Sequence, residues 1–182
     1  MGTSWHVSCV SDATTAPQLE AVISKALDEV DQAMSTYKPD SEISRFSKSS
    51  TGISVSAPSF YVISVAIDIA KQTNGAFDPT VMPLVNIWGF GPETNSPSAP
   101  TDAAIASAME ICGWQHLQLS NDSFFVGKDI EELEIDLSAI AKGFGADNVA
   151  AALDASGVTD YMIEVGGEVR VRGNSGKQRP WR

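Results

Sequence analysis

Apolar residues recur at helical spacing in several parts of the chain. The longest such stretch begins at Leu19 and ends at Met34, with apolar side chains on one side and charged side chains on the other. This is the pattern of an amphipathic helix that buries one face. Two further helices are expected over residues 58–74 and 101–112, because each combines inward apolar positions with a residue that favours a helix start or end. A helix of small residues is expected over 141–155, ending near Gly157.

Shorter runs of apolar, β-branched and aromatic residues predict strands. They fall at residues 5–10, 53–55, 117–119, 124–126, 133–137, 161–165 and 168–171. Residues 76–100 form a long connection rich in Gly, Pro, Asn and Ser, and its first half carries enough apolar side chains to pack. Helices and short strands mix without a strict βαβ rhythm, so we predict an α+β fold with mostly antiparallel strands.

Length and charge limit the classes of function. The 182 residues suffice for one domain with a real core, which we expect to comprise the whole chain. The net charge of −11 at pH 7 argues against binding to nucleic acid or to an anionic membrane surface. An acidic protein would more readily bind a phosphate-bearing ligand together with a divalent cation. The chain shows no signal peptide and no apolar run long enough to span a bilayer.

The cysteines and the chain ends add two expectations. Cys9 and Cys112 fit no zinc motif, and we expect buried thiols rather than a disulfide. Residues 1–5 lead directly into a strand, and residues 179–182 stop without a helix cap or a polar tail. We therefore expect the chain to be cut at both ends.

The segment over residues 136–147 offers the most informative chemistry. Asp136 closes an apolar run, a turn of small residues follows, and Lys142 with two glycines opens a helix. The first N–H groups of a helix lack partners and lie at the positive end of the peptide dipoles, so this end favours anions. A diphosphate, with or without a divalent metal, would suit such a site. The alternative is an ordinary helix start with Lys142 in solvent.

Three further constellations have both a functional and a structural interpretation. Asp78, next to Phe77 and before a proline, would be a ligand-facing carboxylate beside an aromatic wall, or part of an Asp-Pro turn. Tyr37 offers a flat face for an aromatic cofactor ring, or simply packs at a helix end. Gly166 and Gly167 permit close approach of a ligand to the backbone, or form a β-bulge.

Two weaker features remain open. The aromatic run over residues 88–91 could cover a planar ligand or anchor the long connection. His6 and His116 lie far apart in sequence and match no catalytic triad, so we expect surface or strand histidines.

Taken together, these segments resemble the FAD:protein FMN transferases, the ApbE-like flavin transferases formerly called thiamine-biosynthesis lipoproteins. Six ordered motifs carry the resemblance, and their order along nearly the whole chain makes it far more specific than any one motif. They are residues 1–3, 35–38, 75–81, 83–91, 136–143 and 165–168.

The resemblance implies an ApbE-like fold and a site for FAD and Mg²⁺. Proteins of this family cleave FAD and transfer FMN to a threonine or serine of an acceptor protein, releasing AMP; some instead hydrolyse FAD to FMN and AMP. A non-catalytic flavin-binding module is the third alternative. By position, the residues similar to the family's FAD contacts are Met1, Tyr37, Ala76, Phe77, Asp78, Asp136 and Lys142. Ala139 is similar to the residue whose backbone carbonyl helps to hold the metal.

The resemblance also implies what lies outside this chain. The family's later motifs, which supply the remaining metal ligands and the histidine linked to catalysis, are absent from this sequence. The catalytic residues are therefore expected in a missing C-terminal part. Family members are commonly exported bacterial lipoproteins, so the resemblance implies a location on the periplasmic side of the cell envelope.

Overall fold

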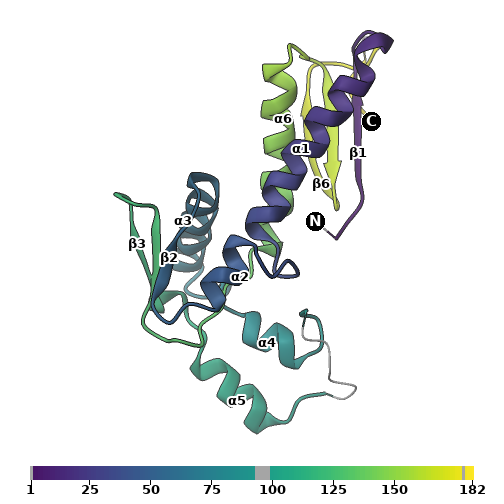
Figure 1. Ribbon diagram of the computed structural model, residues 1–182. Coiled ribbons are helices and arrows are strands. Elements are labelled where there is room, and N and C mark those ends of the chain that lie inside the picture. The colour runs from purple at the N-terminus through teal and green to yellow at the C-terminus, as the bar shows by residue number, and fades with distance from the viewer. Residues whose placement is uncertain (1, 93–98, 178) are drawn as a thin grey trace. The chain divides into compact units, whose positions relative to one another are not determined.

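A computed structural model describes residues 2–92, 99–177 and 179–182. Within them the chain forms six α-helices and two small antiparallel sheets, which confirms the predicted α+β class (Figure 1). The contacts divide the chain into two compact units. Unit 1 contains Met1–Asp31 and Ile140–Arg182, and unit 2 contains Gln32–Ala139.

Unit 1 is a three-stranded sheet covered by helices. The strand order is β1–β5–β6, with β1 at Trp5–Cys9, β5 at Tyr161–Val165 and β6 at Glu168–Arg172. Helix α1 (Ala16–Met34) follows the 3₁₀ turn η1 (Ala13–Thr15), and helix α6 covers Ser138–Ala155; both run beside the sheet (Figure 1). The boundary between the two units falls inside these two helices.

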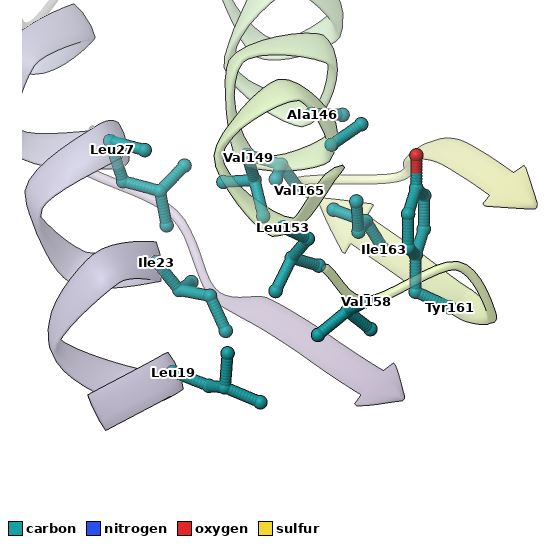
Figure 2. Close-up of a cluster of buried hydrophobic side chains, with 12 residues drawn as sticks. Leu19, Ile23, Leu27, Ala146, Val149, Leu153, Val158, Tyr161, Ile163 and Val165 are labelled. Atoms are coloured by element: carbon teal, nitrogen blue, oxygen red, sulfur yellow. The ribbon is translucent and has the colours of Figure 1, made fainter. Parts of the chain in front are cut away.

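The core of unit 1 joins these three elements. Leu19, Ile23 and Leu27 on α1 point toward Val149 and Leu153 on α6 (Figure 2). Alternate residues of β5 are buried in the same cluster, as expected of a strand with one face on the core. The sequence therefore predicted both helices and this strand, and the structure shows which face of the strand is buried.

Unit 2 contains the other helices and a second sheet. The helices are α2 (Glu42–Ser47), α3 (Ala57–Gln72), α4 (Met82–Ile87) and α5 (Asp102–Glu110). The strand order is β2–β4–β3, with β2 at Gly52–Ser54, β3 at Leu117–Ser120 after the 3₁₀ turn η2 (Trp114–His116), and β4 at Phe125–Lys128. Phe60 of α3 lies 5.4 Å from Phe124 between ring centroids, which joins α3 to the end of the β3–β4 hairpin.

Helix boundaries in unit 2 follow local signals. The hydroxyls of Ser41, Ser56 and Thr101 each accept a hydrogen bond from the backbone N–H three residues later, so they cap α2, α3 and α5. Asn74 and Gly75 end α3 in the left-handed conformation that the sequence predicted. The long connection differs from its prediction because residues 82–87 form α4, and residues 93–98 of its solvated part lie outside the described residues.

The strand predicted over residues 133–137 is wrong. Leu133, Ile135 and Leu137 are buried and alternate with half-buried residues, which gave the strand-like pattern. Within the described residues, however, no strand pairs with them. Their backbone hydrogen bonds go elsewhere: the Leu133 carbonyl accepts from the Lys128 ammonium, and the Asp136 N–H donates to the Pro79 carbonyl. We call residues 133–137 the extended segment.

Candidate functional site

Asp136 lies at the junction between the extended segment and α6. Its backbone N–H donates to the Pro79 carbonyl at 2.8 Å, and its Oδ1 accepts the N–H of Ser138, the first residue of α6, at 2.8 Å. One carboxylate oxygen thus satisfies a helix N–H that has no partner within the helix. The bond to Pro79 also places Asp136 beside the Asp78–Thr80 turn, so two of the predicted site segments meet in unit 2.

Asp78 is the centre of a partly buried hydrogen-bond network. Its Oδ1 accepts from the backbone N–H of Thr80 at 2.8 Å and from the Thr80 hydroxyl at 2.7 Å. Its Oδ2 accepts from the N–H of Trp114 at 3.1 Å. The Thr80 hydroxyl in turn accepts from the N–H of Gly113 at 2.6 Å. The structure therefore shows that Asp78 is part of an Asp-Pro turn. Its carboxylate has about four acceptor positions, so one remains available to a ligand.

Replacing Thr80 with valine is expected to lower the free energy of unfolding by about 2 kcal/mol, because the half-buried Gly113 N–H would lose its acceptor. The Thr80→Ser variant keeps the hydroxyl and loses only a methyl group, so it should lose about 1 kcal/mol. Urea unfolding of both variants measures the difference. A valine variant as stable as the serine variant would show that this network contributes nothing.

A pocket of about 300 Å³ adjoins Tyr37 in unit 2. We call it the Tyr37 pocket. Helix α2 lines it with Ser44 and Ser47, and the extended segment lines it with Glu134 and Ile135. Residues of α4 complete the wall. Its volume is at the lower end of the roughly 300–1,000 Å³ typical of small-molecule sites.

Tyr37 is exposed at 68%, so one aromatic face is available to a ligand. Its hydroxyl donates to the Phe90 carbonyl at 3.3 Å, which ties it to the aromatic run over residues 88–91. That run forms a left-handed helix end: the N–H of Gly89 bonds to the Asn86 carbonyl and that of Phe90 to the Val85 carbonyl. The run thus anchors a loop, and the exposed Phe90 and Trp88 leave the ligand-covering alternative open.

Gly91 packs closely against the side chain of Asn86. A Cβ at Gly91 would lie 1.8 Å from Asn86 Oδ1, so no larger residue fits without moving that side chain. Asn86 lines the Tyr37 pocket, and its Oδ1 is buried without a hydrogen-bond partner. The glycine at this position therefore has a packing reason, which sequence inspection alone did not supply.

The remaining predicted contacts in unit 2 lie on backbone turns. The N–H of Ala76 donates to the Thr73 carbonyl and that of Phe77 to the Thr73 hydroxyl, which extends the end of α3. Ala76 is exposed and Phe77 half-buried. Ala139 is exposed in the first turn of α6.

Lys142 belongs to unit 1, where it borders the β5–β6 hairpin. A Cβ at Gly166 would lie 2.7 Å from Lys142 Cδ and 2.8 Å from Thr3 Oγ1, so this glycine permits the close packing. Gly166 and Gly167 have φ values of 55° and 95°, as in a type I′ hairpin turn, so the β-bulge alternative is wrong. Met1, the other predicted contact in this unit, lies outside the described residues.

Both histidines pair with carboxylates. His6 Nδ1 lies 3.0 Å from Glu164, and His116 Nδ1 lies 2.8 Å from Asp129. The hydrogen bond from His6 and then the Gly167 N–H hold the pKa of Glu164 below its ordinary value. Cys9 and Cys112 are free thiols, and burial followed by the Asp78 charge raises the pKa of Cys112.

The residues present fit part of a magnesium site. Among the described residues, no group of three or more His, Cys, Asp or Glu side chains gathers to hold a metal. Mg²⁺, however, commonly takes only one or two protein carboxylates together with phosphate oxygens and water. The second carboxylate oxygen of Asp136 and the carbonyl of Ala139 are oxygen donors of the right kind near one helix start.

Sequence reasoning gave no role to Thr80 or Lys128, two of the buried polar residues. Thr80 is fully buried, and Lys128 at the end of β4 is only 5% exposed. Burial lowers the pKa of Lys128, and the charges of Glu134, Glu131 and Glu132 oppose this shift. A lysine following an apolar strand was the only signal available, and such lysines are usually exposed.

Comparisons with known proteins agree over the whole chain. The model of the ApbE family matches residues 1–182. An FAD:protein FMN transferase of Vibrio cholerae serotype O1 is 42% identical over 186 residues, which cover 100% of this chain and 55% of that protein. One of Haemophilus influenzae is 39% identical over 189 residues, with the same two shares. The chain thus spans about half the length of the curated relatives it matches.

Solved structures give the same result. The flavin transferase ApbE from Vibrio cholerae matches with a TM-score of 0.95 and 41% identity, covering 100% of this chain and 60% of that one. The apo form of the Pseudomonas stutzeri flavinyl transferase ApbE matches with a TM-score of 0.91 and 29% identity, covering 100% and 61%. In the part of this chain that the structure describes, no helix combines the length and the hydropathy needed to cross a membrane.

Proposed function

The chain belongs to the ApbE family, and from this we propose that the full-length protein transfers FMN from FAD to a threonine or serine of an acceptor protein, releasing AMP. The single observation that carries the proposal is the meeting of Asp136 with the Asp78–Thr80 turn through the Asp136–Pro79 hydrogen bond. The names of the relatives, FAD:protein FMN transferase, support the same reaction.

Each residue would have a distinct role in binding FAD. Tyr37, with its exposed ring beside the pocket, would stack on a planar ring of FAD. The start of α6 would receive the diphosphate, because its first N–H groups and its dipole favour negative charge. Lys142, by its resemblance to one of the family's FAD contacts, would add a cation for the phosphoryl oxygens.

Asp136 and the Ala139 carbonyl would hold Mg²⁺ together with the diphosphate. When bound, the metal would neutralise charge that develops on the diphosphate as the P–O bond breaks. The Asp78 network would keep the neighbouring turn in place, since its hydrogen bonds fix the carboxylate from three directions.

The direct test incubates the full-length protein with FAD, Mg²⁺ and candidate acceptor proteins. We expect a covalent flavin on the acceptor, detected by mass spectrometry, and AMP in solution. Free FMN and AMP formed without any acceptor would favour FAD hydrolysis instead. Stable FAD binding with no turnover under either condition would support a flavin-binding module and refute the transferase.

The Tyr37→Ala variant of the full-length protein is expected to bind FAD about tenfold more weakly, because it loses an aromatic stacking surface. The affinity of the variant for ADP, which lacks the flavin ring, should fall much less. Tyr37→Phe keeps the ring and removes only the bond to the Phe90 carbonyl, so it is the matched control and should bind FAD almost normally. Calorimetric titration with both nucleotides measures this, and equal losses for FAD and ADP would argue against stacking on the flavin.

For location, we propose the periplasmic side of a bacterial cell envelope, with a lipid anchor supplied by the full-length protein. The resemblance to exported family members motivates this. Cell fractionation of the source organism, with an antibody to the protein, tests it: recovery in the cytosolic fraction would refute it.

A further inference from the structure

Lys128 is a buried cation between two walls of the Tyr37 pocket. Its ammonium donates to the Ser47 carbonyl at 3.1 Å and to the Leu133 carbonyl at 2.9 Å. Ser47 is the last residue of α2 and lines the pocket, while Leu133 begins the extended segment, whose next two residues line it. One side chain therefore connects two segments that are far apart in sequence and adjacent in the pocket wall.

The contacts of Lys128 are suited to holding the Ser47 and Leu133 carbonyls at a fixed distance from each other. The carbonyls at the end of a helix lack intrahelical partners and lie at its negative end, so a cation there stabilises α2. The Lys128 ammonium also lies over the ring of the buried Phe46, 4.9 Å from its centroid, which adds a cation–π contact. Burying a lysine is costly unless it is well paired, and here the partners are the backbone of two pocket walls.

The extended segment is held at a second point. Its Asp136 N–H donates to the Pro79 carbonyl, next to Asp78. Lys128 at one end and Pro79 at the other thus set the position of the segment that carries Glu134, Ile135 and Asp136. Loss of the Lys128 end would leave the wall of the pocket free to shift relative to α2.

We propose that Lys128 is a positioning residue for FAD: by holding the Ser47 and Leu133 carbonyls, it fixes the width of the Tyr37 pocket from behind without touching the ligand. The inference rests on the proposed function, since it takes this pocket as part of the FAD site. Nothing in the reaction requires Lys128 to exchange a proton or to contact a phosphate.

The test uses the Lys128→Met variant of the full-length protein, which keeps a long side chain and loses the ammonium. We expect the Kd for FAD and the KM for FAD to rise about tenfold, because small displacements of a binding wall are costly, with kcat within about threefold of the wild type. The matched control is Val126→Ala, two residues earlier on β4 and fully buried, which loosens the same strand without releasing either wall. It should lower the urea midpoint while leaving the Kd for FAD within about twofold.

Lys128→Gln provides a rescue, because its amide can still donate to a carbonyl; its Kd should lie between those of the wild type and the methionine variant. If the methionine variant does not fold, the glutamine variant decides: a Kd above that of Val126→Ala supports the proposal. A Kd equal to that of Val126→Ala, in whichever Lys128 variant folds, overturns the proposal while the proposed function stands. A wild-type protein that binds no FAD at all would overturn both.

Discussion

The Asp136→Ala variant of the full-length protein is expected to transfer flavin about a hundredfold more slowly and to bind FAD with Mg²⁺ about tenfold more weakly. The reason is the loss of the one carboxylate at the start of α6, where the diphosphate and the metal are proposed to bind. Helix content should be retained, because α6 is held by its buried face in the core of unit 1. Calorimetry with FAD and Mg²⁺, a transfer assay and circular dichroism measure the three quantities.

Two further variants separate charge from capping. Asp136 Oδ1 accepts the Ser138 N–H, so alanine should also lower the free energy of unfolding by about 1 kcal/mol. Asp136→Asn keeps an acceptor oxygen and should restore this stability, while activity stays low because the charge is gone. Asp102→Ala removes an acid from the first turn of α5, far from the proposed site in sequence, and should leave FAD binding unchanged. Normal affinity in Asp136→Ala would contradict the proposed position of the diphosphate.

The Gly52→Ala variant is expected to lose about 3 kcal/mol of unfolding free energy. Gly52 begins β2 with a φ of 123°, and an added Cβ would lie 2.2 Å from the Val126 carbonyl oxygen and 2.6 Å from Gly127 Cα on β4. Because these atoms belong to the backbone of the neighbouring strand, neither can move without breaking the β2–β4 pairing. Urea unfolding measures the loss as a lower midpoint.

Gly143→Ala is the matched control for this substitution. Gly143 lies within α6, and an added Cβ there meets nothing within 4 Å. Alanine should therefore raise the unfolding free energy by up to about 1 kcal/mol, since glycine is unfavourable inside a helix. If the two substitutions changed the unfolding free energy equally, the close contact between Gly52 and the backbone of β4 would not limit the residue at this position.

Local signals in the sequence were enough to predict most helices and strands. The spacing of apolar residues predicted α1, α3 and α5, and a run of small residues predicted α6. The caps at Thr101 and at residues 74–75 placed the start of α5 and the end of α3 within a few residues. These features depend on interactions between residues three or four positions apart, which the sequence displays directly. The extended segment was misread because burial of alternate side chains looks the same with or without a partner strand.

For the candidate site, too, some features could be predicted from the sequence and others only from the tertiary structure. The sequence alone determined helices α1, α3, α5 and α6, the antiparallel hairpins and, through ordered motifs, the chain's family and the residues around Asp78 and Asp136. Only the tertiary structure decided that Asp78 is held by Trp114, that Asp136 is tied to Pro79, and that Lys128 reaches Ser47, 81 residues earlier. These hydrogen bonds join residues whose proximity depends on how the elements pack, and a polar side chain shows no sign in the sequence of whether it will be buried among distant carbonyls or exposed to water.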